Sequence, residues 1–142
     1  LQLFSPKSSS EGAAYRDPFM RSYIQSIKVI YPPDKSYSCF IEGDYPLEVF
    51  KTNVNNGKKI CIIKDSFGDA FATWAVNNYE EAYVIDYRMF NGGTYGDYGS
   101  GKNDFKISDF YNFVKFDDLV IISYPVTVST GSSVQLLTKM VN

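Results

Sequence analysis

The sequence predicts a single α/β domain over residues 1–142, a three-layer sandwich in which helices flank a mainly parallel sheet. Continuous apolar runs of the kind found in buried parallel strands occur at 59–64, 81–87 and 118–124. Stretches with the spacing of amphipathic helices follow each of these runs. Right-handed crossovers would bring such strands side by side, with the helices on the faces of the sheet.

The segments before the first of these strands are expected to be more varied. Residues 5–17 are small, polar and aperiodic, so residues 1–20 are interpreted as an irregular lead-in. The runs 23–31 and 36–41, joined by Pro32-Pro33-Asp34-Lys35, predict a β-hairpin that precedes the sheet. Residues 47–52 fit either a short helix or an extended edge.

The alternating pattern begins after the turn Asn55-Asn56-Gly57, with a strand at 59–64 and a helix at 67–78. A second strand at 81–87 leads to a glycine-rich loop at 91–104, and the third strand at 118–124 ends at Pro125. The helices are recognised by apolar residues that share one face: Phe67, Ala70, Phe71, Trp74 and Ala75 in the first, Ile107, Phe110, Tyr111 and Val114 in the second, and Val134, Leu137 and Val141 in the last.

Composition excludes several classes of function. The formal net charge is −2, from 14 basic and 16 acidic residues without a basic stripe, which argues against nucleic-acid binding. No apolar run approaches the ~18 residues of a membrane span. The loop at 91–104 has the aromatic and carboxylate mixture of carbohydrate-binding surfaces, or is simply mobile. Its acidic residues do not have calcium-loop spacing, so neither a metal nor a cofactor is predicted.

Ser66 is the candidate nucleophile, because it lies at a strand-to-helix turn, where ligands and nucleophiles usually lie in open α/β sheets. Gly68 would let a substrate approach the backbone, and its N–H is a candidate oxyanion donor. The alternative is that the Ser66 hydroxyl only caps the helix, with Asp69 three residues later as in a capping box. A serine hydroxyl normally needs an imidazole for activation, and the chain has no histidine.

Two further groups are expected at the same edge of the sheet. Arg88, in the pair Asp86-x-Arg88 at the end of the second strand, could hold an anion or polarise an acyl oxygen, although a salt bridge that closes the sheet edge is favoured. Hydroxyls follow the third strand as substrate contacts or, more simply, as loop residues: Ser123, Thr127, Ser129 and Thr130. Of the two cysteines, Cys61 is predicted to be a small buried hydrophobe, and a disulfide with Cys39 is left open.

The segments KKICIIKDSFG (58–68) and VIDYR (84–88) together resemble the carboxyl-terminal portion of the DHHW family, as does YSCFIEGDYPL at 37–47. These are bacterial surface or secreted proteins of SGNH-hydrolase-like, flavodoxin-like architecture, related to alginate O-acetyltransferases. The resemblance covers about residues 23–141. It implies that Ser66 is the nucleophile, that Arg88 belongs to the site, and that the protein is extracellular or on the cell surface.

In that family the serine works with an Asp-His pair from an upstream Asp-His-His-Trp motif, which this chain lacks. Either the chain is a piece of a longer protein whose amino-terminal segment supplies the pair, or it is a degenerate relative; we expect the former. The resulting hypothesis is a serine esterase or O-acyltransferase acting on a carbohydrate or another acylated small molecule, inactive as this piece. The alternative is a non-catalytic module that binds glycan or protein.

Overall fold

The computed structural model describes residues 40–41, 44–90, 106–129 and 131–142, and it confirms the α/β class. The predicted lead-in, the hairpin apart from its last two residues, and the glycine-rich loop at 91–104 lie outside the described residues. Along the chain the elements are β1 (Leu47–Lys51), β2 (Lys59–Lys64), α1 (Gly68–Ala75), β3 (Glu81–Asp86), α2 (Ile107–Val114), β4 (Asp118–Ile122), α3 (Pro125–Ser129) and α4 (Gly131–Val141).

The four strands form one open sheet in the order β1-β3-β2-β4. β2 is parallel to both β3 and β4, whereas β1 runs antiparallel to β3. The prediction of a mainly parallel sheet is therefore wrong, because the sheet is mixed. The reason lies in the connection between β1 and β2, since residues 52–58 are too few for the crossover of a dozen or more residues that parallel strands require.

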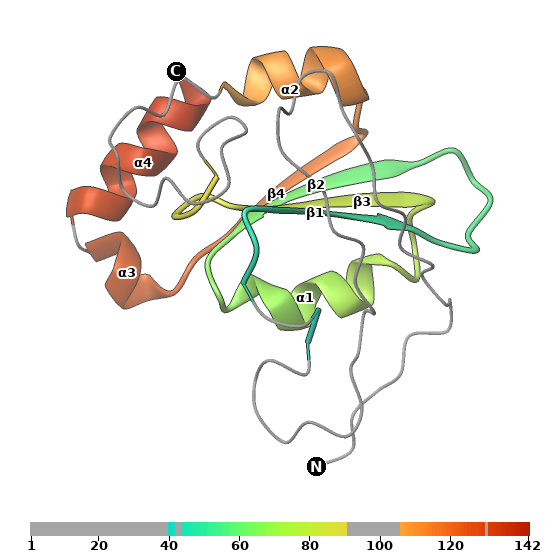
Figure 1. The fold of residues 1–142 in the computed structure, drawn as a ribbon, viewed down its shortest axis with the longest axis horizontal. Coiled ribbons are helices and arrows are strands. Elements are labelled where there is room, and N and C mark those ends of the chain that lie inside the picture. The colour runs from blue at the N-terminus through green and yellow to red at the C-terminus, as the bar shows by residue number, and fades with distance from the viewer. Residues whose placement is uncertain (1–39, 42–43, 91–105, 130) are drawn as a thin grey trace.

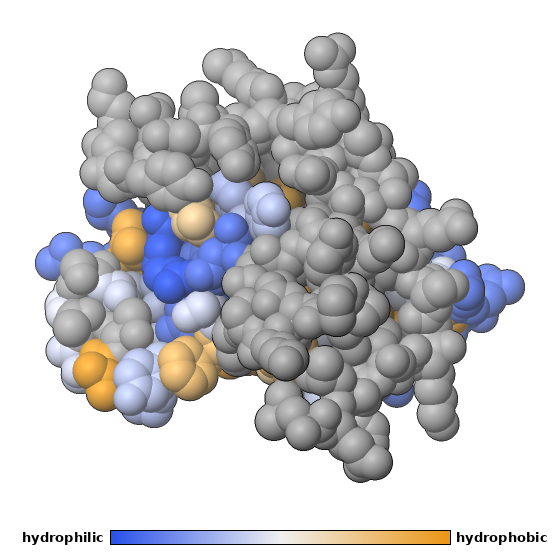
Figure 2. Space-filling view, turned by 60° about the horizontal axis from the view of Figure 1, so that its bottom comes forward, coloured by the Kyte–Doolittle hydropathy of each residue, from blue (hydrophilic) through white to orange (hydrophobic). Residues whose placement is uncertain are grey.

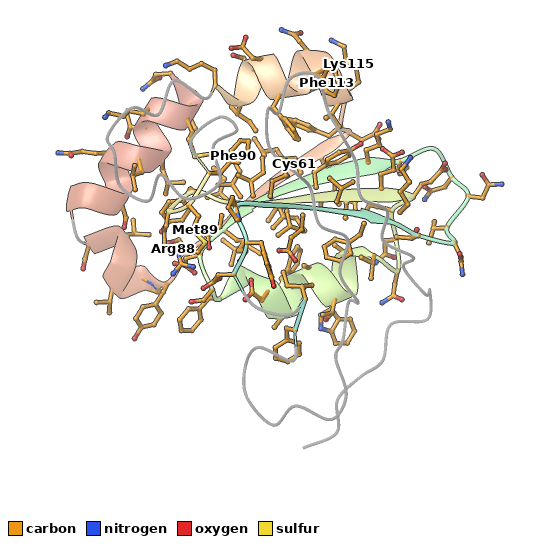
Figure 3. The ribbon with its side chains drawn as sticks, in the orientation of Figure 1. Cys61, Arg88, Met89, Phe90, Phe113 and Lys115 are labelled. Carbon is orange, nitrogen blue, oxygen red and sulfur yellow. The ribbon has the colours of Figure 1, made fainter. Side chains whose placement is uncertain are left out.

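Helices cover both faces of this sheet (Figure 1). Alternate strand residues such as Cys61 and Ile63 pack toward α2 and α4, and their neighbours Ile60 and Ile62 pack toward α1. The continuous apolar run of β2 is thus explained by burial on both faces, as the sequence predicted. Cys61 is a free, fully buried thiol within this core, as expected (Figure 3).

The rotation of α1 about its axis differs from the prediction. The aromatic residues expected to face the core point outward, with Phe67 and Trp74 each more than half exposed, at 55% and 56%. The buried face is instead made of small and polar residues: Gly68, Asp69, Ala72, Thr73 and Ala75. On this buried face, Asp69 contacts Lys64 at the end of β2. On the visible part of the α1 side, hydrophobic and hydrophilic residues lie side by side rather than in one continuous patch (Figure 2).

The carboxyl-terminal elements depart from the prediction in a similar way. β4 was expected to be a buried strand, yet it is an edge strand whose residues Leu119 and Ile121 are 43% and 46% exposed. The helix α3 was not predicted. In α4 the expected apolar residues Val134 and Val141 are exposed, while Ser133 and Met140 are buried. An apolar run indicates only that burial of its side chains is favourable. The topology of the sheet decides which of these side chains are buried.

Candidate functional site

Ser66 lies in the turn between β2 and α1, at the carboxyl edge of the parallel strands. Its side chain is partly exposed, and its hydroxyl forms no hydrogen bond with any residue that the structure describes. The alternative in which this hydroxyl caps α1 is not observed, because the helix begins after Phe67 without a side-chain cap. The Ser66 hydroxyl is therefore available at the position that the sequence predicted.

Asp65, and not Ser66, accepts a hydrogen bond from the backbone at the start of α1. Its Oδ1 accepts a hydrogen bond from the backbone N–H of Phe67 at 3.0 Å, which satisfies a donor at the start of α1. Its Oδ2 accepts from the hydroxyl of Ser123 at 2.8 Å and from the N–H of Tyr124 at 2.7 Å. Burial alone would raise the pKa of Asp65, but the hydrogen bonds from Tyr124 and Ser123 lower it below its ordinary value.

A second contact joins the same turn to the end of β4. The ring of Phe67 stacks on that of Tyr124, with centroids 4.5 Å apart and planes 9° apart. Asp65 and Phe67, the two chain neighbours of Ser66, are thus both attached to the segment that follows β4. This arrangement holds the Ser66 backbone on either side, while the hydroxyl bonds to none of the described residues.

The predicted convergence of groups after the three parallel strands is partly present. The Tyr87 hydroxyl lies 2.8 Å from the Ser123 hydroxyl, which in turn donates to Asp65, so the ends of β3, β4 and β2 are linked. The Ser129 hydroxyl donates instead to the carbonyl of Val126, a local bond within α3. The side chains of Thr127 and Thr130 lie outside the described residues.

Arg88 lies at the same edge of the sheet (Figure 3). The register pairs Lys64 with Asp86, so Ser66 and Arg88 each stand two residues beyond the same rung. The guanidinium donates to Asp86 through Nε at 2.9 Å and Nη2 at 2.5 Å, and Nη2 lies 2.8 Å from Asp44. These hydrogen bonds raise the pKa of Arg88. The salt bridge favoured from the sequence is present, and a role for Arg88 in substrate binding stays a prediction.

Gly68 has a structural explanation that the sequence did not reveal. A Cβ at this position would lie 2.3 Å from the Cβ of Lys64, so only glycine lets α1 begin this close to the end of β2. The Gly68 N–H donates to the carbonyl of Asp65 at 2.9 Å. An oxyanion would have to compete with that bond, and the oxyanion role of Gly68 stays a prediction.

Sequence reasoning missed a buried group of charges below the turn. Lys64 is fully buried, and its Nζ lies 2.8 Å from Asp44, 2.5 Å from Asp69 and 3.5 Å from Asp86. Burial would lower the pKa of Lys64, but the charge of Asp86 and the hydrogen bond to Asp44 raise it. Charged residues within or directly after apolar strand runs, as in LEVF and CIIK, were the signal for such a group.

Neither a metal site nor a membrane-spanning helix is found among the residues that the structure describes. No group of three or more acidic or cysteine side chains there could hold a metal ion. None of the described helices combines the length and the apolarity that are needed to cross a bilayer.

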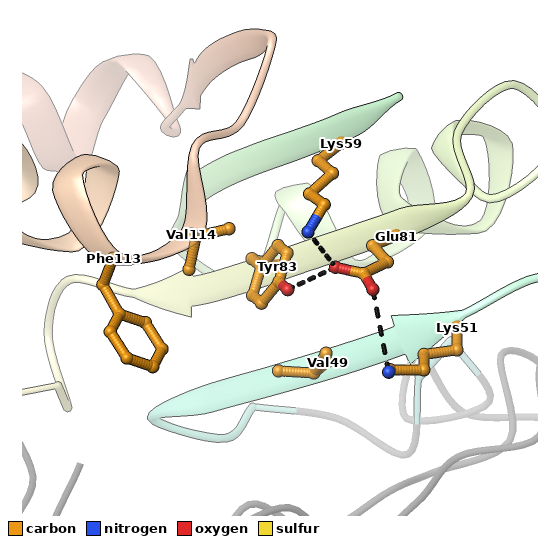
Figure 4. A pocket seen from close by; sticks show the side chains of 7 residues that line it. All are labelled: Val49, Lys51, Lys59, Glu81, Tyr83, Phe113 and Val114. Carbon is orange, nitrogen blue, oxygen red and sulfur yellow. Dashed lines mark hydrogen bonds and ion pairs between the residues drawn. The ribbon is translucent and has the colours of Figure 1, made fainter. Parts of the chain in front are cut away.

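A hollow of about 240 Å³ lies at the opposite end of the strands from Ser66 (Figure 4). Its walls include Val49, Phe113 and Val114. At its polar side Glu81 accepts the Tyr83 hydroxyl at 2.5 Å and lies 3.0 Å from Lys59, so these groups satisfy one another. This hollow is therefore separate from the candidate site.

No protein-family model and no curated protein matches the chain. Among solved structures it is similar to a DHHW family protein from Eubacterium siraeum, with a TM-score of 0.68 and 23% identity, covering 96% of this chain and 42% of that protein. It is also similar to Bacillus cereus PatB1 in two structures. One, with a sulfonyl adduct, has a TM-score of 0.53 and 16% identity, and covers 75% of this chain and 30% of PatB1. The other has a TM-score of 0.56 and 14% identity, and covers 89% and 38%.

The chain thus spans less than half the length of each of these proteins. At such low identity the similarity concerns the fold and not the activity. The fold of this chain is that of a part of the DHHW family protein.

Proposed function

We propose that this chain carries the nucleophile of a serine esterase or O-acyltransferase of the DHHW family, with Ser66 as the attacking residue. The observation that carries the proposal is the partly exposed Ser66 hydroxyl, which bonds to no residue that the structure describes. Its flanking residues are both held by the segment after β4, Asp65 by Ser123 and Tyr124, and Phe67 by Tyr124. Such preorganisation of a hydroxyl at the carboxyl edge of a parallel sheet is what acyl transfer requires of its nucleophile.

In the proposed reaction the Ser66 Oγ attacks an acyl carbonyl, its proton passes to a base, and the acyl group stays on the serine until an acceptor hydroxyl or water removes it. The base is proposed to come from an Asp-His pair in a segment outside this sequence, since the chain contains no histidine. The resemblance supports an acylated carbohydrate as the substrate and the bacterial surface or the extracellular space as the location.

The exposed edge of β4 supports the existence of such a segment. β4 is apolar on both faces, as strands inside a sheet are, yet within the described part of the chain no strand pairs with its outer edge. A further strand beside β4 would enlarge the sheet into the three-layer, SGNH-like sandwich that the sequence predicted. It would also lie next to Ser123 and Tyr124, the residues that contact the Ser66 turn.

The non-catalytic binding module remains the second candidate, because two of the proposed site groups already have partners. The Arg88 guanidinium binds Asp86 and Asp44, and the Gly68 N–H binds the Asp65 carbonyl. In this alternative Ser66 has no chemical role, and replacing it changes nothing that can be measured.

The test compares this chain with the same chain extended by the coding sequence that precedes it. We expect only the extended protein to hydrolyse p-nitrophenyl acetate and to be sulfonylated at one serine by phenylmethylsulfonyl fluoride, as read by mass spectrometry. Ser66→Ala should abolish both signals, whereas Ser129→Ala, whose hydroxyl bonds only within α3, should retain them.

Two results would contradict the proposal. If the extended protein is sulfonylated at a serine other than Ser66, or at no serine, Ser66 is not the nucleophile and the binding module is the better explanation. Turnover by the 142-residue chain at the level of an intact esterase, lost in Ser66→Ala, would show that no external base is needed. Weak residual activity decides neither point, since sites lacking a triad member still exceed water by roughly 10³-fold.

A further inference from the structure

Glu48 is a fully buried acid without a hydrogen-bond partner among the residues that the structure describes. It is the second residue of β1 and 0% exposed, and neither of its carboxyl oxygens is hydrogen-bonded to a described residue. Its neighbours Leu47 and Val49 pack toward α2 and α4, so Glu48 points to the α1 side of the sheet, as Phe50 does. The free-energy cost of burying a carboxylate without hydrogen bonds is too high for it to remain charged, unless a neighbouring cation compensates the charge.

Most of the charged groups near Glu48 are themselves acids, so they do not compensate a negative charge on it. Lys64 on β2, Asp86 on β3 and Asp69 on α1 lie on the same side of the sheet and act on Glu48 electrostatically, together with Asp44 from the segment before β1. Arg88, after β3, completes the group through its bonds to Asp86 and Asp44. Four carboxyl groups therefore face two cations, and the cluster is neutral only when two of the four are protonated.

The contact between Lys64 and Asp69 has a particular position in the chain. Lys64 is the last residue of β2 and Asp69 lies in the first turn of α1, so the 2.5 Å contact between Lys64 Nζ and Asp69 Oδ1 spans the turn that contains Ser66. The Asp69 Oδ1 in this pair is buried and lacks a hydrogen bond of good alignment. Any change in the charge of Asp69 acts directly across the Ser66 turn.

We propose that Glu48 and Asp69 hold protons in the folded protein and form a pH-dependent latch, which keeps the first turn of α1, and Ser66 with it, against the sheet. When both carboxyls are neutral the buried cluster carries no net charge. When Asp69 and Glu48 lose their protons, the cluster becomes negative, and separation of α1 from the sheet relieves the repulsion by exposing Asp69 to water. The latch operates whether or not Ser66 is a nucleophile.

The direction of the pH effect follows from proton linkage. Burial raises the pKa of Asp69 to about 7 and that of Glu48 well above its ordinary value, while the charge of Lys64 offsets only part of this effect. Because the closed form binds more protons than the open form between the ordinary and the raised pKa values, closing is favoured at low pH and opening as pH rises. For each proton released, the opening constant increases roughly tenfold per pH unit.

Hydrogen exchange measured by mass spectrometry tests the latch in the 142-residue chain. After correction for the intrinsic effect of pH on exchange, we expect protection of a peptide covering residues 66–72 to fall at least tenfold per unit between about pH 5 and 7. A peptide covering α2, which packs on the other face of the sheet, serves as the internal control and should change less. Asp69→Asn and Glu48→Gln, which keep the size of the side chain, should each reduce the slope by about one proton.

A second measurement does not depend on the variants folding. The carboxyl carbon of Glu48, assigned by through-bond NMR correlation in the wild-type chain, should titrate well above the ordinary pKa of a glutamate. Titration of Glu48 with the ordinary pKa of a glutamate would overturn the proposal. The same pH dependence in α2 as in residues 66–72 would show global unfolding instead of a local latch, and would overturn it as well.

Discussion

The Lys64 side chain occupies the space in which a side chain at residue 68 would have to lie. A Cβ on Gly68 would be 2.3 Å from the Lys64 Cβ and 3.0 Å from its Cγ, distances at which one of the two residues must move. Neither can move freely, because Lys64 is held by Asp44, Asp69 and Asp86 in a fully buried position. This close approach allows the helix that follows Ser66 to begin immediately at the edge of the sheet.

Gly68→Ala should therefore destabilise the protein, although alanine is the better helix former. We expect a loss of about 1–3 kcal/mol in the free energy of unfolding, the usual cost of overpacking, measured by urea denaturation. Gly131→Ala at the start of α4 is the matched control, since a Cβ there meets nothing within 4 Å. An equal effect of the two substitutions would show that the Lys64 contact does not constrain the turn.

Asp65→Asn should weaken the attachment of the Ser66 turn to β4. The amide cannot accept the bonds from Ser123 and Tyr124 as a carboxylate does, so we expect a loss of about 1–3 kcal/mol at pH 7. The pKa of Asp65 is lowered in the folded protein, so its contribution is present above the ordinary pKa of 3.8 and is lost as the pH falls through the folded value.

The difference between wild type and Asp65→Asn should accordingly shrink when denaturation is repeated at acid pH. Ser123→Ala, which removes only one of the bonds, should cost less than Asp65→Asn at pH 7. A difference that stays constant down to pH 3 would exclude the ionised carboxylate as the cause.

The stacked rings of Phe67 and Tyr124 should be energetically coupled. In a double-mutant cycle with Phe67→Leu and Tyr124→Leu, we expect a coupling energy of about 0.5–1.5 kcal/mol. The cycle of Phe67 with Tyr111, a similarly exposed tyrosine on α2, should give a value near zero because α2 and α1 cover opposite faces of the sheet. Additive effects of the first pair would mean that the stack does not hold the turn.

Cys61 should be unreactive toward thiol reagents in the folded protein. It is fully buried, and burial raises the pKa of its thiol to about 12. In a Cys39→Ser background, we expect reaction with 5,5′-dithiobis(2-nitrobenzoic acid) at pH 8 only at the rate of unfolding, and immediately in 6 M guanidinium chloride. Fast modification without denaturant would show that the space between β2 and α2 is open to solvent.

The sequence was sufficient to predict β2, β3, β4, α1, α2 and α4, and that Ser66 follows β2, but it left β1 open between helix and strand and did not predict α3. These are local properties, set by apolar periodicity and by turn residues. It did not reveal the direction of β1 or the edge position of β4, because pairing between distant strands leaves no local trace. Nor did it predict the rotation of α1, in which Asp69 contacts Lys64 and Gly68 packs closely on it, while the aromatic residues Phe67, Phe71 and Trp74 face outward.

The candidate site was predictable to a similar extent. The turn and its position at the sheet edge followed from the strand–helix order, and the salt bridge of Arg88 followed from the alternation of side chains along β3. The roles of Asp65 and Ser123 were not visible, since they depend on two residues 58 positions apart that meet only when β2 and β4 pair. Buried charges such as Glu48 were missed because a single acidic residue in an apolar strand usually lies on the face of the strand that is exposed to solvent.

The order of the strands in the sheet has a consequence for how quickly the chain acquires its structure. β2 occupies an inner position, but its two partners are both made after it, and the parallel pairing with β4 joins Ile60 to Asp118. The entropy lost in closing so long a loop increases only slowly with its length, so the native state is little penalised. The rate is affected more strongly, because sequence-distant parallel pairing is formed slowly. During synthesis, β2 therefore leaves the ribosome with both edges unpaired, and after β3 has joined, its other edge stays unpaired until β4 follows. In this interval the nascent chain is most exposed to aggregation.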